Sequence, residues 1–245
     1  PPVPVPRVLS DPDITRIREW FEAEGFAGIG DDLIHRTALV YAMENRHNPL
    51  TEYVARCEAE LPDEVASTMV RPAINPDQPA ADALSLWPIT GFGADDTPLS
   101  RAVGRAFGIA MVRRARNPGC QQDYVLVIEG PQGVGKSRGL AALVGEDWLL
   151  ENLPDLHDKD AMANLAGSWL CEIAELVSLR RSEVETMKAY VTRRHDKFRP
   201  AYGRNRITMK RVCSFAGTTN AATYLKDVTG NRRYWIVTSR AGVDV

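Results

Sequence analysis

The hydrophobic residues of roughly the first half of the chain recur at helical spacing. Ile14, Ile17 and Phe21 would share one face of a helix that begins near residue 12. Residues 101–114 follow the same period, and Asn117-Pro118-Gly119 ends it. Between these segments lies a second hydrophobic stripe that ends near Asn48-Pro49 and comprises Leu33, Leu39, Val40 and Met43. We therefore predict three helical segments.

Two segments lack any such period. Residues 71–98 contain Gly91, Gly93 and the five prolines Pro72, Pro76, Pro79, Pro88 and Pro98. Proline removes a backbone donor and glycine adds conformational freedom, so both interrupt regular structure. We predict a loop or linker here. Residues 1–10 begin with alternating proline and are predicted to be an extended linker, as at a junction with a longer polypeptide or in a natural tail.

Short continuous hydrophobic runs dominate the second half of the chain. The runs at residues 124–128, 168–173, 212–216 and 234–237 are typical of buried strands. Helices are predicted between them, from Lys136 to about Val144 and from Ser182 to Thr192. Strands that alternate with helices favour an α/β fold with a parallel sheet and helices on both faces. The predicted organisation is a linker (1–10), a helical N-terminal region (11–116) and an α/β core (117–245).

Composition narrows the class of protein only slightly. The 245 residues are 44% hydrophobic and 25% charged, which is ordinary for a globular protein, and the net charge is -2. The cysteines form no C-x-x-C pair, and Cys171 and Cys213 lie in hydrophobic runs, so we predict buried reduced thiols. No 18-residue hydrophobic run or signal segment is present. We therefore expect a cytoplasmic protein without membrane association.

A glycine-rich loop follows the first predicted strand. Residues 130–137 read Gly-Pro-Gln-Gly-Val-Gly-Lys-Ser, which fits the Walker A pattern, with a strand before and a helix after. Such a loop wraps the phosphates of ATP with backbone N–H groups, while its lysine contacts the β- and γ-phosphates and its serine ligates Mg²⁺. An ordinary glycine-rich turn is the alternative. The predicted ATP contacts are Gly130, Gln132, Gly133, Val134, Gly135, Lys136, Ser137 and Arg138.

A P-loop also needs an acidic partner on a neighbouring strand to hold the metal and polarise water. Glu172 ends a hydrophobic run, and Glu175 follows three residues later. Both reach one phosphate only if the strand ends near Ile173 and the chain turns, because alternate strand residues face opposite sides. We predict that Ser137 and Glu172 ligate Mg²⁺ and that Glu172 or Glu175 is the base. A solvated glutamate at a strand end is the alternative.

Three further residues are candidates for contacts with the transferred phosphate. Asn220 ends the polar cluster after the third predicted strand and would sense the γ-phosphate; a turn-forming asparagine is the alternative. Arg232 and Arg233 follow a Gly-Asn turn. They would supply charge to the transition state, in cis or across a subunit interface, unless they form a solvated basic turn.

The most basic stretch lies between residues 180 and 211. It holds eleven lysines and arginines against three acidic residues, an excess of eight on a chain of net charge -2. Phe198 and Tyr202 are interleaved, which suits binding to a nucleic-acid backbone. A solvated surface is the alternative. The predicted nucleic-acid contacts are Lys188, Arg193, Arg194, Lys197, Arg199 and Arg204.

From about Asn48 to Val237 the chain resembles the virulence-associated E family, P-loop ATPases of phages and mobile islands that are similar to superfamily-three helicases and phage primase–helicases. The resemblance rests on Asn117-Pro-Gly-Cys120, Glu129-Gly-Pro-Gln-Gly-Val-Gly-Lys-Ser137, Glu172-Ile-Ala-Glu-Leu176, Lys188, Asp196-Lys-Phe-Arg-Pro-Ala-Tyr-Gly-Arg204, Thr218-Thr-Asn220 and Asp227-Val-Thr-Gly-Asn-Arg-Arg233. It implies an AAA+-like core over residues 117–245.

The resemblance also implies a function. It implies ATP hydrolysis with Mg²⁺ in the replication of a phage or mobile element, as in a superfamily-three-like DNA helicase. The expected partners are single-stranded or forked DNA, replication proteins and further copies of the chain in a homo-oligomeric ring of the full-length protein. Two alternatives remain from the residues alone. One is a nucleotide-gated module that binds DNA or protein with little turnover, and the weaker one is a small-molecule kinase.

Overall fold

The computed structural model describes residues 11–44, 48–59, 83–153, 161–165, 167–174, 181–199, 206–220 and 231–240. The chain divides into two compact units, residues 1–52 and residues 53–245. The predicted boundary between residues 116 and 117 lies inside the second unit, where the helices before it share a core with the sheet after it. As a domain assignment that boundary stays a prediction.

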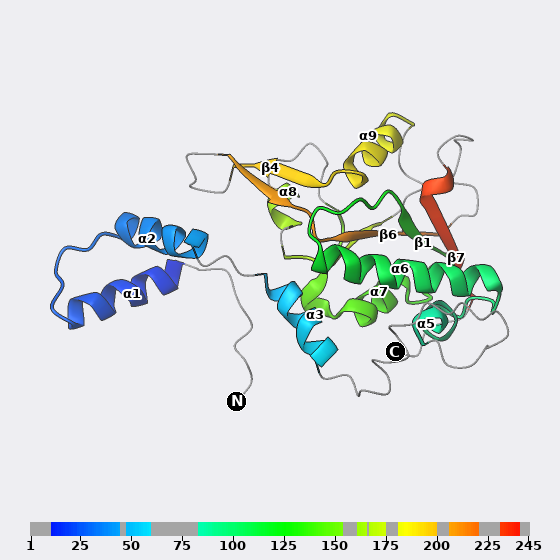
Figure 1. Cartoon of the computed structure of the whole chain (residues 1–245), viewed down its shortest axis with the longest axis horizontal. Helices are drawn as coiled ribbons and strands as arrows, with labels where there is room; N and C mark the ends of the chain where they lie inside the picture. Colours follow the sequence, from blue (N-terminus) through cyan, green and yellow to red (C-terminus); the bar gives the residue numbers. More distant parts are fainter. Residues whose placement is uncertain are drawn as a thin grey trace. The chain divides into compact units, whose positions relative to one another are not determined.

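The first unit contains two helices, α1 (Asp11–Ala23) and α2 (Asp31–Glu44), drawn in blue in Figure 1. Arg18 Nη1 donates a hydrogen bond to Asp31 Oδ1 at 2.8 Å and so ties α1 to α2. Ile14 and Ile34 are the buried hydrophobic residues of the pair. The predicted stripe on α2 was wrong in part, because Leu33 and Val40 are more than half exposed, whereas Ile34 is buried. The side chains of Leu39 and Met43 are outside those that the structure describes.

The second unit is built on a five-stranded sheet in the order β2-β3-β6-β1-β7, with every neighbouring pair parallel. The predicted α/β fold with a parallel sheet is therefore confirmed. Strand β6 lies between β1 and β3, so the chain segments that follow these three strands meet at one edge of the sheet. The strands are β1 (Val125–Glu129), β2 (Leu149–Leu150), β3 (Leu170–Ile173), β6 (Ser214–Thr219) and β7 (Tyr234–Thr238).

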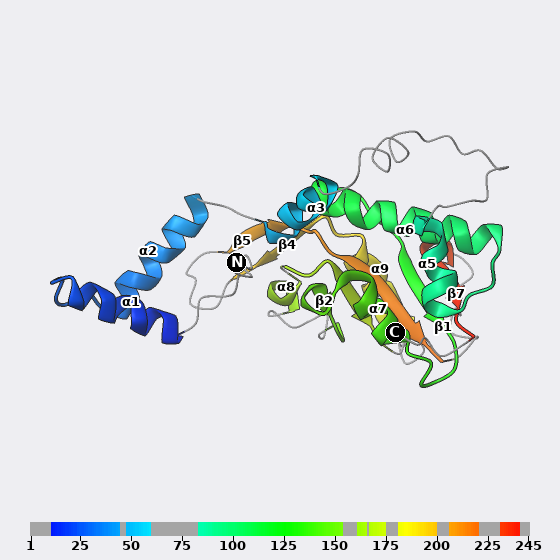
Figure 2. The ribbon, with the colours of Figure 1, turned by 90° about the horizontal axis from the view of Figure 1, so that it is seen from below.

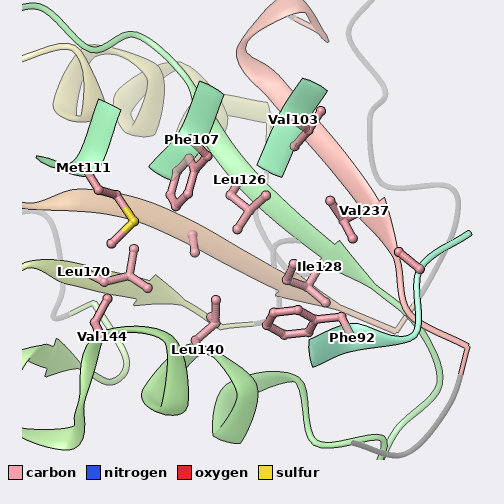
Figure 3. Packing of buried hydrophobic residues seen from close by; sticks show 12 residues of the cluster. Phe92, Val103, Phe107, Met111, Leu126, Ile128, Leu140, Val144, Leu170 and Val237 are labelled. Carbon is pink, nitrogen blue, oxygen red and sulfur yellow. The ribbon is translucent and has the colours of Figure 1, made fainter. Parts of the chain in front are cut away.

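Helices cover both faces of this sheet, as predicted. Leu126 and Ile128 of β1 face one side, and Val125 and Val127 face the other, as successive residues of a strand do. The first face packs on α5 (Ala83–Phe92), α6 (Pro98–Arg116) and α7 (Lys136–Val144), and Figure 3 shows this core. The second face packs on α9 (Arg181–Val191). The remaining elements are α3 (Pro49–Ala59), α8 (Ala161–Asn164) and the 3-10 turns η1 (Glu146–Trp148) and η3 (Asn231–Arg233).

Helix α5 corrects the predicted loop over residues 71–98, since residues 83–92 of that segment are helical. Pro88 lies inside the helix and deprives it of one backbone hydrogen bond. The loss is offset by close packing on α6: Trp87 Nε1 donates to the carbonyl oxygen of Gly104 at 3.0 Å. A Cβ on Gly104 would lie 2.7 Å from the Pro88 ring, so the absence of a side chain there permits the approach.

Part of the basic stretch forms a two-stranded ribbon that is separate from the main sheet and was not predicted. It pairs β4 (His195–Phe198) with β5 (Ile207–Lys210) in antiparallel fashion (Figure 2). Asp196 and Phe198 are buried, while His195 and Lys197 alternate with them and are exposed. The hydrophobic content of residues 195–210 is low, which hid the period-2 pattern of these strands.

Cys171 and Cys213 are free thiols with no exposed surface, which confirms the prediction that they are buried and reduced. Burial raises the pKa of the Cys213 thiol to about 11 and also raises the pKa of Cys171. Within the described part of the chain, no helix combines the length and the hydrophobicity needed to cross a membrane.

Candidate functional site

A cavity of about 370 Å³ lies at the carboxyl ends of four parallel strands. Each strand supplies lining residues from its end or from the segment that follows it, because parallel strands place their carboxyl ends at one edge of the sheet. The lining residues are Gln132, Gly133, Gly135, Lys136, Ser137 and Arg138 after β1, Glu151 and Asn152 after β2, Glu172 and Ala174 from β3, and Thr218, Thr219 and Asn220 from β6. This volume is at the lower end of the range for small-molecule sites.

The glycine-rich loop connects β1 to α7, as predicted. Gly133 and Gly135 have φ angles of +82° and +81°, a region that other residues rarely adopt. Gly135 is the residue before the first turn of α7, whose free backbone N–H groups and partial positive charge favour an anion. Gly130 begins the loop against β7, where a Cβ on it would lie 2.5 Å from the carbonyl oxygen of Ser239.

The ammonium group of Lys136 lies at the centre of this loop. It donates hydrogen bonds to the carbonyl oxygens of Gly130 (2.8 Å) and Pro131 (2.7 Å) and to Asn220 Oδ1 (2.7 Å). Only 9% of the residue is exposed. This burial lowers the pKa of Lys136, against the charge of Glu172, which raises it. The lysine thus places a partly desolvated positive charge at the wall of the cavity, with Asn220 beside it.

Glu172 is the acidic residue of the cavity. It is 3% exposed, which excludes a solvated glutamate, and its Oε1 accepts hydrogen bonds from Ser137 Oγ and Thr218 Oγ1, both at 2.7 Å. Strand β3 ends at Ile173, as a site at this edge requires. Glu175 lies outside the described residues, so its predicted role stays a prediction. A buried carboxylate between two hydroxyl groups suits a functional role better than a structural one.

The oxygen atoms of Ser137 and Glu172 are of the type that Mg²⁺ prefers. Mg²⁺ at phosphate sites is commonly held by one or two protein oxygens, with phosphate oxygens and water completing the octahedron. No group of three or more His, Cys, Asp or Glu side chains forms a metal cage among the residues with described positions. The donor set fits a Mg²⁺ ion that arrives with a phosphate ligand and does not fit an all-protein metal centre.

The cavity also contains residues that sequence reasoning missed. Thr218 belongs to the polar cluster noted after the third strand but was not assigned a role. Glu151 and Asn152 follow β2, a strand of two residues that is too short to produce a hydrophobic pattern. Asn152 has a φ angle of +53° and is the one described non-glycine residue with a positive φ. Conversely, Gly130 and Val134 were predicted ATP contacts and do not line the cavity.

The structure does not bring Arg232 and Arg233 into this cavity. They form η3 directly before β7, whose first residue, Tyr234, pairs with Val125 at the start of β1. The cavity lies beyond the other end of β1. The geometry therefore argues against a contact between these arginines and a ligand in the same chain.

The basic ribbon presents one exposed face. His195 pairs with Lys210 and Lys197 with Thr208, and all four residues are exposed. Arg199 and Arg206 are also exposed, on either side of the segment 200–205. Lys210 and Arg206 are thus further surface charges, which the alternation of exposed and buried positions would have indicated. We call this set the basic face: His195, Lys197, Arg199, Arg206, Thr208 and Lys210.

The other predicted nucleic-acid contacts are placed differently. Lys188 on α9 is only 9% exposed, so it does not contribute to the basic face. Arg193 is half-buried and its guanidinium lies 4.9 Å from the Tyr190 ring centroid. Arg194 is exposed, and its Nε donates to the carbonyl oxygen of Gly119 at 2.7 Å. Arg204 lies outside the described residues.

A buried ion pair anchors the ribbon to the sheet. Arg211 Nε donates to Asp196 Oδ2 at 2.8 Å, and a second bond joins Arg211 Nη2 to Asp196 Oδ1. Arg211 Nη1 also donates to the carbonyl oxygen of Tyr190 on α9 at 2.5 Å. Both charged residues are less than 5% exposed. These bonds fix β4, β5 and α9 to one another just before the start of β6.

Comparison with known proteins identifies one family. Residues 78–245 match the virulence-associated protein E-like domain. No curated protein matches the sequence. Two solved structures are similar over 65% of the chain: an A-form apo structure of the NrS-1 C-terminal region (16% identity, TM-score 0.46) and another apo structure of that region (15% identity, TM-score 0.45). The chain spans 37% and 38% of those two chains.

The family match covers well over half of the chain and includes the glycine-rich loop, Glu172, Asn220 and the basic ribbon. It agrees with the resemblance seen in the sequence motifs. The chain belongs to the family of proteins with a virulence-associated protein E-like domain.

Proposed function

We propose that the chain is an ATPase that binds ATP with Mg²⁺ in the cavity at the carboxyl ends of the strands and hydrolyses it. The observation that carries this proposal is the convergence of Lys136, Ser137, Glu172 and Asn220 on one cavity behind a glycine-rich loop. These residues come from three different strand ends. An ordinary glycine-rich turn would need no buried carboxylate and no buried lysine beside it.

Each residue has a defined part in this mechanism. Bound ATP and Mg²⁺ supply the phosphoanhydride bond and the charge that neutralises its oxygens. Lys136 exchanges its contacts with Gly130, Pro131 and Asn220 for phosphate oxygens, which restores charge pairing to a desolvated ammonium group. Ser137 and Glu172 would hold the metal through their side-chain oxygen atoms. Glu172 would also orient the attacking water, and Asn220, released from Lys136, would contact the γ-phosphate.

Arg232 and Arg233 are proposed to act on a neighbouring copy of the chain. Arg232 is exposed and lies away from the cavity of its own chain. Arginines that stabilise phosphoryl transfer can be supplied in trans. This role requires a homo-oligomer, such as a ring, in which η3 of one copy reaches the cavity of the next.

The hydrolysis is proposed to drive movement on single-stranded or forked DNA in the replication of a phage or mobile element, as in a superfamily-three-like helicase. The basic face supports this part of the proposal, because exposed cations gathered on one face of a ribbon can contact the phosphates of a nucleic-acid strand. The family membership supports it as well. Replication proteins are the expected partners of such a motor.

The variant Glu172→Gln separates binding from hydrolysis. We expect it to bind ATP with an affinity near that of the wild type, because glutamine keeps the volume and one carbonyl oxygen. Its steady-state phosphate release is expected to fall by about 10²-fold or more, since glutamine cannot accept a proton from water. Phosphate release is measured with and without single-stranded DNA.

Stimulation of the wild-type rate by DNA is the outcome that supports a motor. A wild-type protein that binds ATP tightly but releases phosphate no faster than Glu172→Gln, with or without DNA, would instead be a nucleotide-gated module that binds DNA or protein. Loss of ATP binding in Glu172→Gln would show that the carboxylate acts in binding and would contradict the assigned role.

Binding to single-stranded DNA is expected to weaken steeply with salt. Each phosphate contact contributes a slope of about -0.7 in log K against log[salt] for single strands. We expect Lys197→Gln and Arg199→Gln each to reduce that slope by about 0.7 in a fluorescence anisotropy titration. Arg36→Gln, an exposed arginine of the first unit, is the matched control and should leave the slope unchanged. A salt-independent affinity would refute the role of the basic face.

A further inference from the structure

A second cavity, of about 400 Å³, lies at the opposite end of the sheet from the first. Its residues precede β1 and β6, whereas those of the first cavity follow them. The six residues of β6 separate the two ends by roughly 15–20 Å at about 3.3 Å per residue. The lining residues are Arg113, Asn117, Pro118, Gly119, Cys120, Gln121, Arg194, His195 and Lys210.

Within the described part of the chain, the charged residues that line this second cavity are cations. They are Arg113, Arg194 and Lys210; His195 lies beside them, and this lining includes no acidic residue. These four side chains come from α6, from the link between α9 and β4, from β4 and from β5, so they surround the hollow from four segments. His195 and Lys210 are directly paired across the ribbon, an arrangement that is unfavourable when both are charged and nothing lies between them.

A fifth positive charge lies buried behind this wall. Arg114 has no exposed surface, and its hydrogen-bond partners among the described residues are neutral: Nη2 donates to the carbonyl oxygen of Arg193 at 2.8 Å and Nη1 to Gln122 Oε1 at 3.5 Å. Its Nε has no hydrogen-bond partner within the described part of the chain. Burial lowers the pKa of Arg114, which reflects the free energy needed to keep this charge away from water. Asp196, whose carboxylate is paired with Arg211, opposes this shift only in small part, and an anion bound nearby would compensate the buried charge further.

The backbone around the cavity is fixed before any ligand arrives. The Gly119 N–H donates to the carbonyl oxygen of Arg211 (2.9 Å), and the Arg211 N–H donates to that of Arg194 (3.0 Å). Arg194 Nε in turn donates a hydrogen bond to the carbonyl oxygen of Gly119 (2.7 Å), so the three residues are bonded in a ring. Gly119 has a φ angle of +83°, and a Cβ there would lie 3.2 Å from the Arg194 oxygen. These contacts show what Gly119 does in the Asn117-Pro-Gly-Cys120 segment: it holds the backbone before β1 against that of Arg194 and Arg211. They also hold the cationic groups in place before a ligand binds, which strengthens binding.

We propose that this second cavity binds a phosphate monoester, such as the terminal phosphate of a nucleic-acid strand or the phosphate of a free nucleotide. A phosphodiester carries one negative charge, whereas a monoester carries nearly two at neutral pH. A hollow with three permanent cations, a histidine and a buried arginine behind it matches the dianion better than the monoanion. If the ligand is the end of a DNA strand, the proposal rests on the proposed binding of DNA to the adjacent basic face. If the ligand is a free nucleotide, it does not.

The test compares three single-stranded DNA oligonucleotides of one sequence that carry an internal fluorophore and end in a 5′-phosphate, in a 3′-phosphate or in hydroxyl groups only. We expect one phosphorylated strand to bind about tenfold more tightly than the hydroxyl strand, the effect of one added charge-assisted contact. Arg113→Gln and Lys210→Gln are expected to abolish this preference. Lys197→Gln, which removes the same charge outside the cavity, should weaken all three strands equally and keep the preference.

A second experiment, with a free nucleotide in place of DNA, tests the second cavity independently of the proposed binding of DNA. Adenosine monophosphate is added to the Lys136→Ala protein, in which the first cavity is disabled, and the unfolding midpoint is measured. A rise that disappears on adding Arg113→Gln supports the cavity even if no oligonucleotide binds, and then only the DNA part of the proposed function fails. Equal affinities for the three strands with no rise in the midpoint would overturn the proposal. A preference that survives both Arg113→Gln and Lys210→Gln would overturn it too.

Discussion

Replacing Lys136 with alanine is expected to abolish ATP hydrolysis, with phosphate release reduced by at least about 10²-fold, as when one electrostatic contact to the reacting group is removed. The ammonium group has no substitute in the loop, since the other loop residues lining the cavity are uncharged up to Ser137. Its present partners are two carbonyl groups and an amide, which shows that the charge is held in place before a phosphate arrives. Steady-state phosphate release is the measurement.

Lys136→Met is the matched variant, because it keeps the hydrophobic stem and removes only the charge. In an Arg113→Gln background, which removes the contribution of the second cavity, both variants should also lose the rise in unfolding midpoint that saturating ATP gives. The midpoint without nucleotide must be compared, because the carbonyl groups of Gly130 and Pro131 lose a donor in both variants. Near-normal turnover in either variant, or a wild-type midpoint that ATP does not shift, would refute the site.

Replacing Asp196 with alanine is expected to destabilise the fold by about 3–5 kcal/mol, the range for breaking one partner of a buried ion pair. Arg211 would keep its charge in a buried site, where the carbonyl group of Tyr190 accepts a hydrogen bond from it and the Tyr190 and Phe215 rings lie 4.6 and 5.4 Å from its guanidinium carbon. Chemical denaturation followed by far-UV circular dichroism measures the change in the free energy of unfolding.

Two controls define this effect. Asp96→Ala breaks the exposed pair between Asp96 and Arg101 and should leave the unfolding midpoint unchanged, because solvent already screens that pair. The double variant Asp196→Ala/Arg211→Met removes the buried charge as well and should be more stable than Asp196→Ala alone. If Asp196→Ala were as stable as the wild type, the pair could not be what anchors the ribbon.

The sequence predicted the parts of the fold that have strong local signals. Continuous hydrophobic runs marked the four longer strands of the sheet, and helix α7 has the predicted bounds, because the glycine-rich loop sets its beginning and Gly145 its end. Lys136, Ser137, Glu172 and Asn220 were chosen from motif spacing and strand ends, and the structure brings all four together. Each of these residues lies at or just after the end of a strand that the sequence marks clearly, which is why the sequence reveals them.

The missed features depend on contacts between distant segments. Helix α5 forms despite Pro88 because α6 offers small residues where it packs, and no local pattern shows this. Glu151 and Asn152 reach the cavity through a strand of two residues. The position of Arg232 and Arg233 away from the cavity follows from the parallel pairing of β7 with β1, because these arginines precede β7 and so lie at the amino end of the sheet. The buried position of Lys188 likewise depends on how α9 packs on the sheet.

The tight approach between Gly130 and Ser239 constrains what can vary at the start of the glycine-rich loop. A methyl group at residue 130 would collide with a main-chain oxygen, which cannot turn aside as a side chain would. The Ser239 N–H also donates to the carbonyl oxygen of Glu129 at 2.6 Å, so Glu129, the residue before Gly130, is bonded to the end of the edge strand β7 as well. The pairing of β7 with β1 therefore excludes a side chain at residue 130 on its own, whether or not a nucleotide occupies the loop.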